Sequence, residues 1–543
     1  MREKSKSLNI LLINSFLMPL NELQPLLSQE SDLRVPVFTL PQGVLSLAAY
    51  ARKKNPHFQF KILDFNKELH LFFNGDKKVT TLQAFIFDTL NHLDFKPDVV
   101  GVSVNFSTGH TSSFFIADAV KKKWFEATVV FGGTHVTNFT HRIIEHPCVD
   151  YVIRGSAEKS FDEFLTRLSN GDELSEISGC EPIKDLNELP MLAYDLIDME
   201  YYIEKGGRTH RSKTVRSMPY QFSRGCCFHC TFCVGATVHG HKVISKNNDI
   251  ILQELSHLKE KYKVNSIIAE DDLFGFHKKN FYDLCDKLEH LDLKLQFPSA
   301  FSVRVLDEPM IDRLHEIGIE AAVLAIESGS PYVQKNIINK KIDLSKAISL
   351  SKKFRSKGTL IAGYFIFGFP GETIEMMNET VEFAKKLELD WADFLIAMPL
   401  MGSKMCNEWM ESGVLTEEMM LGIMDGTDFR KRRFNTPEIG AKDLETFAYN
   451  ANIDVNFVNN YNMINGNYDR AIVMLSNYVI DKYPFHIVAL ACRAKCYHEK
   501  GDAKAAKRDI EQIGKMIKTH QESKRMNRLY GEKIDSYRYR DET

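Results

Sequence analysis

The sequence predicts an α/β protein in which two parts with parallel strands are followed by a third part made only of helices. Short apolar runs alternate with helical patterns over residues 8–180, and again from residue 219 to about 400. Such alternation is typical of parallel sheets whose strands are joined by helices. From residue 441 onward only helical patterns remain. We therefore expect domains at 1–182, 213–435 and 436–543, with a solvated linker at 183–212.

The first part is expected to form a doubly wound parallel sheet. Its apolar runs lie at residues 9–13, 60–63, 99–104, 128–131 and 151–153, and each is short and bounded by turn residues. Uninterrupted apolar runs of this length indicate strands that are buried on both faces.

Ligands of a doubly wound sheet bind beyond the carboxyl ends of its strands. Polar residues and glycines follow three of these runs, at 105–108, 132–135 and 154–155. The adjacent Gly132 and Gly133 would let a ligand approach the backbone closely, although a plain tight turn explains them equally well.

The second part is expected to form an open or partial (β/α)6 barrel. We place its six strands at 220–223, 266–269, 295–297, 322–326, 360–367 and 392–397. A loop rich in cysteine follows the first of them. In parallel α/β barrels the chemistry lies at the carboxyl ends of the strands, so the position of this loop favours a function.

Three cysteines in this loop, Cys226, Cys230 and Cys233, are spaced C-x3-C-x2-C. Thiolates are soft ligands that suit zinc or iron–sulfur clusters. A zinc site would take His229, His239 or His241 as its fourth ligand. A four-iron cluster held by only three cysteines would instead leave one iron open to another ligand.

The third part resembles a short helical repeat. The segment Gly466–Ala471 recurs loosely as Gly501–Ala506, a spacing of 35 residues that approximates a tetratricopeptide (TPR) repeat. About one and a half repeats are visible, so we expect a TPR-like helical appendage.

The composition indicates a soluble globular protein. The 543 residues are 44% apolar and 26% charged, and the net charge of -3 gives no sign of nucleic-acid binding. No apolar run is long enough for a membrane span, and the N-terminus lacks the pattern of a signal peptide. Apart from residues 226–233 the cysteines are scattered, which suits a reducing cytoplasm. We expect these six, Cys148, Cys180, Cys285, Cys406, Cys492 and Cys496, to be buried packing residues.

The cysteine spacing, with Phe232 before the last cysteine and Ser223-Arg224-Gly225 before the first, resembles the radical S-adenosylmethionine (radical SAM) superfamily. It is most similar to the subgroup, including the class B methylases, whose N-terminal domain binds cobalamin. Further motifs of that subgroup occur at comparable strand ends, at 270–274, 302–304, 325–330 and 367–373. The resemblance covers about residues 8–400.

The resemblance implies a [4Fe-4S] cluster on the three cysteines, whose open iron binds the amino and carboxylate groups of S-adenosylmethionine. Glu327 would accept hydrogen bonds from the ribose, and Arg304 would pair with a carboxylate. One of Asp271 and Asp272 would contact the methionine amino group. Phe232, Gly368 and Pro370 complete the expected site, the last two in a loop against the adenine. The alternatives are a surface carboxylate for Glu327, a structural salt bridge for Arg304, a helix cap for the aspartates and a plain turn for the loop.

The same resemblance implies cobalamin in the N-terminal domain. The three-part cobalamin motif is incomplete, because Asp64-Phe65-Asn66 lacks its histidine and Ser103-Val104-Asn105 replaces its second part. Radical SAM enzymes of this subgroup resemble each other in lacking that lower axial histidine. The alternative is a degenerate scaffold that binds no corrin. The residues expected at the cobalamin are Ser103, Thr108, Gly132, Gly133 and His135, with His110 as a further candidate.

These features imply a cytoplasmic enzyme that methylates an unactivated carbon. One S-adenosylmethionine would methylate cob(I)alamin, and a second would give the 5′-deoxyadenosyl radical that activates the substrate. Cyclisation, rearrangement or oxidation with the same cofactors is the alternative, and a non-catalytic metal-binding adaptor is a third hypothesis. We expect a small-molecule, lipid or peptide substrate and an electron donor such as flavodoxin or ferredoxin. No residue is assigned as catalytic.

Overall fold

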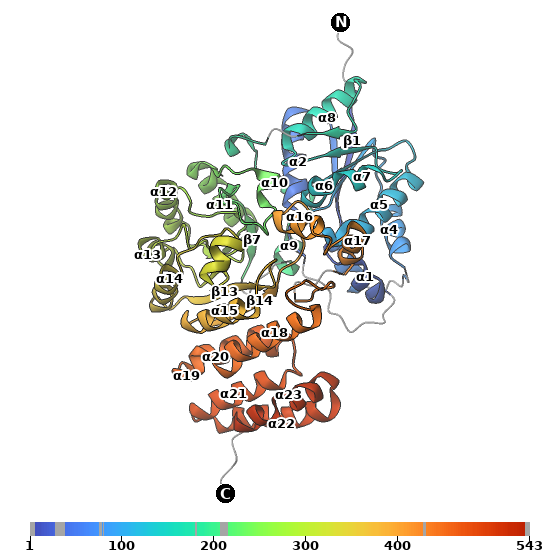
Figure 1. The fold of residues 1–543 in the computed structure, drawn as a ribbon. Helices are drawn as coiled ribbons and strands as arrows, with labels where there is room; N and C mark the ends of the chain where they lie inside the picture. Colours follow the sequence, from blue (N-terminus) through green and yellow to red (C-terminus); the bar gives the residue numbers. More distant parts are fainter. Residues whose placement is uncertain are drawn as a thin grey trace. The chain divides into compact units, whose positions relative to one another are not determined.

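The computed structural model describes residues 6–27, 38–74, 79, 81–179, 182–206, 215–426 and 430–537 (Figure 1). It divides into two compact units. The first comprises Met1–Ser299, Glu316–Ile319 and Met398–Phe434, and the second comprises Ala300–His315, Glu320–Ala397 and Asn435–Thr543. Residues 213–435, which we expect to form one domain, therefore contribute to both units.

The first unit contains a six-stranded parallel sheet with the order β2-β1-β3-β4-β5-β6. Its strands are β1 (Asn9–Asn14), β2 (Gln59–Asp64), β3 (Val99–Ser103), β4 (Thr128–Gly132), β5 (Tyr151–Ile153) and β6 (Ile177–Ser178). The first five agree with the predicted strands. Strand β6 is not predicted, because it has only two residues and Ile177 is exposed.

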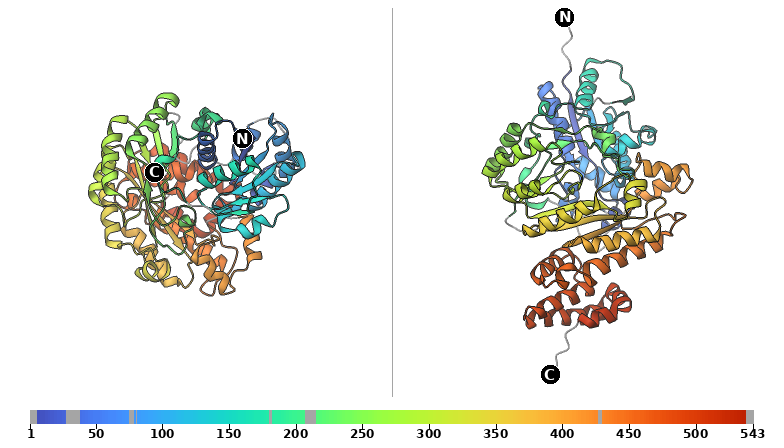
Figure 2. Two further views of the ribbon diagram at one scale, coloured as in Figure 1. Left: turned by 90° about the horizontal axis from the view of Figure 1, so that it is seen from above. Right: turned by 60° about the vertical axis from the view of Figure 1, so that its left-hand side comes forward.

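Helices cover both faces of this sheet, as expected for a doubly wound fold (Figures 1 and 2). Alternate strand residues face the two layers, with Leu11 and Ile13 in one apolar cluster and Ile10 and Leu12 in the other. One layer includes α1 (Leu20–Leu27), α3 (Phe65–Phe73), α4 (Leu82–Asn91) and α5 (His110–Lys123), and the other includes α2 (Gln42–Lys54) and α8 (Glu158–Asn170). The short helices η1 (Ser107–Gly109), α6 (Thr134–Asn138) and α7 (Thr140–Ile144) lie in the loops.

The described part of the expected linker is a packed segment. It contains η2 (Leu186–Glu188), η3 (Tyr194–Leu196) and α9 (Met199–Lys205). Leu186, Leu189 and Tyr202 are buried, so the prediction of a solvated crossing is wrong for residues 183–206. The apolar side chains of this segment alternate with charged ones, and the apolar ones pack inward. The basic stretch 207–213, like Cys180, lies outside the described residues.

The six strands expected for the barrel are present as two three-stranded parallel sheets, one in each unit. The first unit holds β7 (Ser217–Tyr220), β10 (Ser266–Ala269) and β11 (Lys294–Gln296), in the order β11-β10-β7. It also holds a short antiparallel pair, β8 (Ser223–Arg224) and β9 (Ile244–Ser245). The first strand thus ends at Tyr220 and not at Ser223, because β8 turns away to pair with β9. The accompanying helices are α10 (Gly235–His239), α11 (Asn248–Tyr262), α12 (Lys278–Leu288), η4 (Glu289–Leu291), α16 (Lys404–Glu411) and α17 (Glu417–Met424).

The second unit contains β12 (Ala321–Glu327), β13 (Leu360–Phe367) and β14 (Trp391–Ile396), and each neighbouring pair is parallel. Helices α14 (Leu344–Ser356) and α15 (Ile374–Lys386) connect the three strands, and α14 is preceded by the π-helix η5 (Val333–Ile337). Helix α13 (Glu308–Glu316) precedes β12.

All the secondary-structure elements of the described C-terminal residues are helices, as predicted. The elements are α18 (Ala441–Ile453), η6 (Asp454–Val458), α19 (Tyr461–Ile464), α20 (Tyr468–Met474), η7 (Leu475–Ile480), α21 (Ile487–Glu499), α22 (Ala503–Thr519) and α23 (Gln521–Tyr537). Gly466 and Gly501 both have positive φ, and each stands two residues before a helix start, so the sequence repeat is also a structural one. Cys492 and Cys496 are fully buried in this core, as expected.

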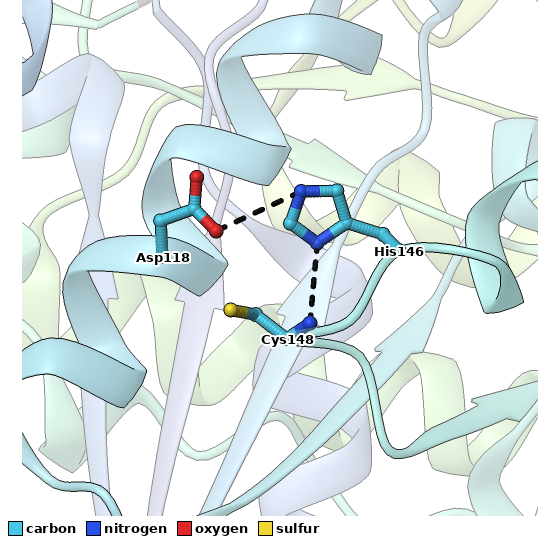
Figure 3. Close-up of side chains that lie close together, drawn as sticks. All are labelled: Asp118, His146 and Cys148. Carbon is cyan, nitrogen blue, oxygen red and sulfur yellow. Dashed lines mark hydrogen bonds and ion pairs between the residues drawn. The ribbon is translucent and has the colours of Figure 1, made fainter.

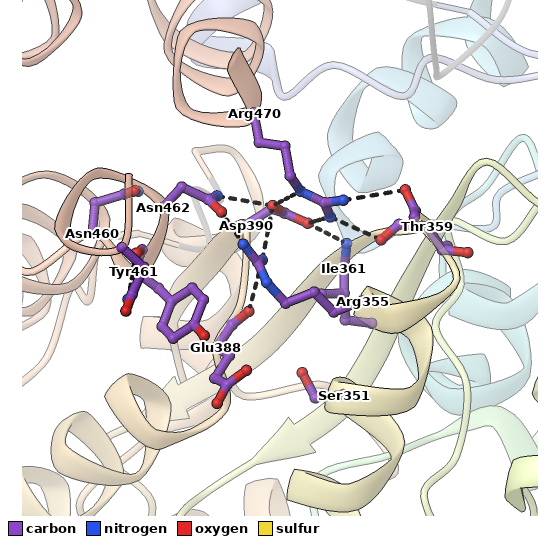
Figure 4. A network of polar contacts seen from close by, with 12 residues as sticks. Ser351, Arg355, Thr359, Ile361, Glu388, Asp390, Asn460, Tyr461, Asn462 and Arg470 are labelled. Carbon is purple, nitrogen blue, oxygen red and sulfur yellow. Dashed lines mark hydrogen bonds and ion pairs between the residues drawn. The ribbon is translucent and has the colours of Figure 1, made fainter. Parts of the chain in front are cut away.

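A buried carboxylate joins the C-terminal helices to β13 and β14 (Figure 4). Asp390, just before β14, has no exposed side-chain surface and pairs with Arg355 of α14 and Arg470 of α20. It also accepts hydrogen bonds from the Asn462 side chain at 2.8 Å and the Ile361 backbone N–H at 2.8 Å. These contacts make the helical region part of the second unit.

Among the helices of the described residues, none combines the length and the apolar character that crossing a membrane requires.

Candidate functional site

The cysteine loop begins at a sharp turn that requires glycine. Gly225 has a φ of 89°, and a Cβ there would collide with the backbone oxygen of Lys242. The loop then turns back on itself, with the Cys233 N–H donating to the Cys230 oxygen at 3.2 Å. The thiols of Cys226 and Cys230 are half-buried and that of Cys233 is exposed, and none forms a disulfide. Phe232 is half-buried beside them.

Two adjacent carboxylates hold the entry to this loop. Asp271 is buried and accepts hydrogen bonds from the Ser223 hydroxyl at 2.6 Å and from the Ser223 and Phe222 N–H groups. Burial raises the pKa of Asp271 to about 7. Asp272 is exposed and accepts from the Gly225 N–H at 2.8 Å. Because Asp271 is buried and Asp272 is exposed, Asp272 is the better candidate for contact with a bound ligand.

The donor atoms of the cysteine loop are not gathered as closely as those of a preformed zinc site. One zinc with Zn–S bonds of about 2.3 Å would hold its thiolates about 3.8 Å apart. Among the described residues, a group of three potential ligands with donor atoms within 4.8 Å of one another occurs at Asp118, His146 and Cys148, and not at the cysteine loop. Three thiolates that each bind a different iron stand further apart, as the cluster prediction requires.

The group of Asp118, His146 and Cys148 has a structural explanation (Figure 3). The Cys148 N–H donates to His146 Nδ1 at 3.3 Å, so the proton of the neutral ring is on Nε2, which lies 3.6 Å from Asp118 Oδ1. The ring also stacks on Phe114 at 4.3 Å. Both ring nitrogens therefore anchor the loop before β5. Cys148 is half-buried, whereas we expect it to be buried. Its partial burial and, to a lesser extent, its contact with the Asp118 carboxylate raise the pKa of the thiol to about 11.

A cavity of 410 Å³ lies at the carboxyl ends of the six-stranded sheet. Ser103, Gly132 and Gly133 line it, as the sequence predicts for a ligand site. Gly133 has a φ of 110°, and a Cβ there would meet the Val104 oxygen at 2.6 Å. Gly43, which also lines the cavity, would place a Cβ in open space. Gly133 is therefore a glycine because the turn after β4 requires it, whereas Gly43 leaves room at the cavity wall.

The other two residues expected at the cobalamin do not line this cavity. Thr108 donates its hydroxyl to the Leu17 oxygen at 2.8 Å. His135 is buried between the Ser107 hydroxyl, 3.1 Å from Nδ1, and His110 Nδ1, 3.0 Å from Nε2. Both therefore support the strand-end loops.

The segment that lacks the motif histidine is fully engaged within the protein. Asp64 is buried and accepts hydrogen bonds from Asn14, Asn66 and the Tyr202 hydroxyl. The Asn66 side chain donates to the Ser15 oxygen and accepts from the Leu17 N–H, both at 2.9 Å. This segment leads from the carboxyl end of β2 into α3 and presents no imidazole to a metal.

Several charged residues of the cavity are not predicted as site residues, although Arg224 belongs to the motif before the cysteines. Arg224, which precedes the cluster motif, pairs with Glu158 of α8 at 2.7 Å, and Ser46 donates to the same Glu158 oxygen at 2.8 Å. Burial favours the protonated form of Glu158, but the Arg224 charge and hydrogen bond hold its pKa below the usual value. Lys246 pairs with Glu254 at 2.7 Å. All of these residues line the cavity.

His239, at the end of α10, also lines the cavity. Its Nδ1 lies 2.8 Å from the Ser156 hydroxyl, which donates to the Val238 oxygen at 3.2 Å. Burial lowers the pKa of His239. Ser156, in the loop after β5, and His239, after the cysteine loop, are therefore joined at one wall of the cavity.

The buried pair of His110 and His135 makes the first unit sensitive to acid. Burial lowers the pKa of His135 to about 3 and that of His110 to about 4. Both rings stay neutral in the fold but take up protons near pH 6.5 when the chain unfolds. Stability that is present above pH 6.5 is thus lost as the pH falls, by about 1.4 kcal/mol per pH unit for each histidine.

We expect His135→Asn to reduce this acid sensitivity. Urea unfolding of the apoprotein between pH 7 and pH 4.5 gives the free energy of unfolding at each pH. Its slope against pH should be smaller than in the wild type by about 1.4 kcal/mol per pH unit, which corresponds to one proton fewer taken up on unfolding. His92→Gln, at an exposed histidine, serves as the control. Equal slopes for His135→Asn and the wild type would contradict the assigned protonation states.

The remaining predicted residues lie in the second unit. Glu327 ends β12, is 7% exposed and pairs with Lys340, whose backbone oxygen accepts from Arg304 at 3.4 Å. Gly368 and Pro370 lie in the loop after β13. This loop is held by the buried Glu372, which accepts from the Gly368 N–H at 2.6 Å. The expected S-adenosylmethionine residues are thus divided between the two units.

Comparison with known proteins identifies two families along the chain. Residues 220–384 match the radical SAM superfamily, and residues 34–165 match the B12 binding domain. An uncharacterized methyltransferase of Pyrococcus horikoshii is 32% identical over 327 residues, which is 57% of this chain and 69% of the relative. Cytidylyl-2-hydroxyethylphosphonate methyltransferase of Streptomyces wedmorensis is 26% identical over 470 residues, 78% of this chain and 87% of the relative.

Solved structures show the same fold. The radical S-adenosylmethionine methyltransferase TsrM from Kitasatospora setae, with cobalamin and a [4Fe-4S] cluster bound, aligns with a TM-score of 0.56 at 16% identity. The alignment covers 75% of this chain and 78% of TsrM. Together with the relative from Pyrococcus horikoshii, these matches establish that the chain belongs to the radical SAM superfamily and carries a B12 binding domain.

Proposed function

We propose that this enzyme uses cobalamin and S-adenosylmethionine to methylate an unactivated carbon of its substrate. One observation carries the proposal. Arg224, two residues before Cys226, lines the cavity at the sheet edge and pairs there with Glu158. The segment expected to hold the cluster and the cavity expected to hold the corrin are thereby built into one unit, which is what transfer between two cofactors needs.

We assign the roles as follows. Cys226, Cys230 and Cys233 hold the cluster, and Asp271 and Gly225 set the turn from which they project. Ser103, Gly132 and Gly133 form the wall against cobalamin, and Glu158 fixes Arg224 at its rim. When bound, the cluster would supply the electron that cleaves S-adenosylmethionine, and cobalamin would supply a cobalt centre that carries the methyl group. The resemblance assigns the remaining contacts to S-adenosylmethionine to Phe232, Asp272, Arg304, Glu327, Gly368 and Pro370.

We propose a small-molecule substrate. The methyltransferases among the relatives act on cytidylyl-2-hydroxyethylphosphonate and on bacteriochlorophyllide d, and TsrM has been solved with tryptophan. A flavodoxin or ferredoxin is proposed as the electron donor. We keep the domain boundaries 1–182, 213–435 and 436–543 as part of this proposal.

Cyclisation is the second candidate, because the relatives include an anaerobic magnesium-protoporphyrin IX monomethyl ester cyclase of Rubrivivax gelatinosus, 23% identical over 370 residues. Its products distinguish it. Radical methylation converts one S-adenosylmethionine to S-adenosylhomocysteine, when the methyl group is donated, and a second to 5′-deoxyadenosine. Radical cyclisation without methyl transfer yields no S-adenosylhomocysteine.

The cobalamin site is tested by filling the cavity. A leucine at Gly43 would enter open space at the cavity wall and also suits the first turn of α2. We expect Gly43→Leu to fold with unchanged thermal stability and to lose at least about tenfold in affinity for hydroxocobalamin. Corrin absorbance after anaerobic reconstitution and gel filtration measures this.

Gly514→Ala in α22, where an added Cβ also meets nothing, is the matched control and should retain the corrin. If wild type and Gly43→Leu retain equal amounts of corrin, cobalamin does not occupy this cavity. If the wild type retains none, the proposed function fails.

A further inference from the structure

Glu327 is held in a strained backbone conformation. It has a φ of 67°, which is uncommon for a residue with a side chain, and the pairing of β12 with β13 shifts register between Ala325 and Glu327. Such conformations are energetically unfavourable and persist where the surroundings enforce them. The bulge turns the carboxylate off the end of β12 into a protein interior, where Glu327 is 7% exposed.

The surroundings of Glu327 are built around Gln334. Its side-chain amide donates to the Ile326 oxygen at 2.8 Å and to the Ser328 oxygen at 2.6 Å, so it grips the backbone on both sides of Glu327. Gln334 belongs to the π-helix η5, and its backbone oxygen accepts from the Lys341 N–H at 3.1 Å. One residue thus connects the strained strand end to the loop that follows η5.

That loop presents Lys340 to Glu327. Lys340 Nζ lies 2.7 Å from Glu327 Oε1, and the two side chains are only 8% and 9% exposed. The neighbours Asn339 and Lys341 both have positive φ, which is a second departure from relaxed backbone in the same loop. Arg304 supports it from the other side by donating to the Lys340 oxygen at 3.4 Å.

A buried ion pair of this kind is rarely retained for stability alone. Removing two charges from water costs several kcal/mol per ion, and apolar residues of the same size often fold as well or better. Here two strained backbone segments are also maintained to bring the charges together. What the pair does provide is orientation, because a carboxylate with one oxygen fixed by an ammonium has its plane and its second oxygen set in space.

We propose that Lys340 is a positioning residue that orients the Glu327 carboxylate to accept hydrogen bonds from the vicinal hydroxyls of the S-adenosylmethionine ribose. The inference rests on the proposed function, in which Glu327 contacts that ribose. A vicinal diol donates two hydrogen bonds that diverge at a fixed angle, so an acceptor held in place before the ligand arrives loses less entropy on binding. Lys340 acts through Glu327 and need not touch the ligand.

The test compares Lys340→Met, Lys340→Arg, Glu327→Gln and the double variant Glu327→Gln/Lys340→Met. Dissociation constants are measured anaerobically by calorimetry on cluster-loaded protein, for S-adenosylmethionine and for its 2′-deoxy analogue. We expect Lys340→Met to weaken S-adenosylmethionine binding about tenfold and to affect the 2′-deoxy analogue about twofold or less. Lys340→Arg should recover most of the lost affinity, because it restores the cation.

The double variant separates positioning from folding. Lys340→Met leaves a buried carboxylate without its cation and is expected to lower the thermal stability of the apoprotein, whereas the double variant buries no charge and should regain that stability. It should still bind S-adenosylmethionine as weakly as Glu327→Gln alone. Equal losses for both ligands in Lys340→Met, or affinity restored along with stability in the double variant, would overturn the positioning role.

Failure of the proposed function gives a different result. If Glu327→Gln weakens S-adenosylmethionine selectively while Lys340→Met does not, Glu327 keeps its role and the inference about Lys340 is wrong. If neither variant changes the affinity of a wild type that binds S-adenosylmethionine, the assignment of Glu327 to the ribose is wrong. If the cluster-loaded wild type binds no S-adenosylmethionine, the proposed function itself fails.

Discussion

Replacing Cys230 with alanine is expected to prevent assembly of a complete cluster and to lower the rate of S-adenosylmethionine cleavage by at least about a thousandfold, about 4 kcal/mol in activation free energy. Cys230 lies in the middle of the C-x3-C-x2-C motif, and its backbone oxygen accepts from the Cys233 N–H, so it defines the turn of the loop. Two thiolates cannot hold three irons. Iron and sulfide content after anaerobic reconstitution, and 5′-deoxyadenosine formed with a chemical reductant, measure the two effects.

Cys227→Ser is the matched control for this experiment. Cys227 lies in the same loop and is also half-buried, but it falls outside the motif. We expect it to retain the iron content and cleavage of the wild type. A fully loaded, active Cys230→Ala protein, or a Cys227→Ser protein as impaired as Cys230→Ala, would show that the ligands have been assigned wrongly.

Replacing Asp390 with alanine should destabilise the second unit by about 3–5 kcal/mol, because it leaves the cations of a buried network without their anion. Arg355, 3.3 Å from the carboxylate, and Arg470, 2.5 Å from it, would both lose their partner (Figure 4). The Ile361 N–H and the Asn462 amide would lose an acceptor as well. Urea unfolding gives the change in stability, and limited proteolysis should show earlier cleavage in the C-terminal helices.

An exposed ion pair in the same helical region provides the comparison. Asp469 pairs with Lys500, but its side chain is 82% exposed. Exposed pairs contribute about 0–1 kcal/mol, so Asp469→Ala should unfold at nearly the wild-type urea concentration. Similar losses from the two substitutions would contradict the claim that the Asp390 network joins the helices to the strands.

The strands could be predicted because they are short apolar runs that are buried on both faces. The run Tyr151–Ile153 is predicted to the residue, whereas β6 has two residues and no apolar run to mark it. The end of the first barrel strand is wrong because pairing of Ser223 and Arg224 with β9 depends on residues about 20 positions away. Sequence periodicity reports local burial, and it does not report which segment a short strand joins.

Candidate residues could be predicted where they form contiguous motifs at strand ends, as for Cys226 and Glu327. Contacts between distant segments could not be predicted. Glu158 and Arg224, for example, are 66 positions apart and belong to no shared pattern. Lys340 is 13 residues from Glu327, a separation that reveals nothing until the π-helix brings the two together. His135 was chosen for its place after two glycines, but its ring turns inward to His110.

The most direct test of the account is to follow the methyl group. The enzyme is reconstituted with iron, sulfide and hydroxocobalamin, reduced, and incubated with S-adenosylmethionine that carries a labelled methyl group. We predict that label appears in the protein-bound corrin fraction with an equivalent amount of S-adenosylhomocysteine, and that Gly43→Leu loses both while keeping its cluster. Formation of 5′-deoxyadenosine by a corrin-loaded wild type, with no label in the corrin and no S-adenosylhomocysteine, would contradict methyl transfer and favour the cyclase-like alternative.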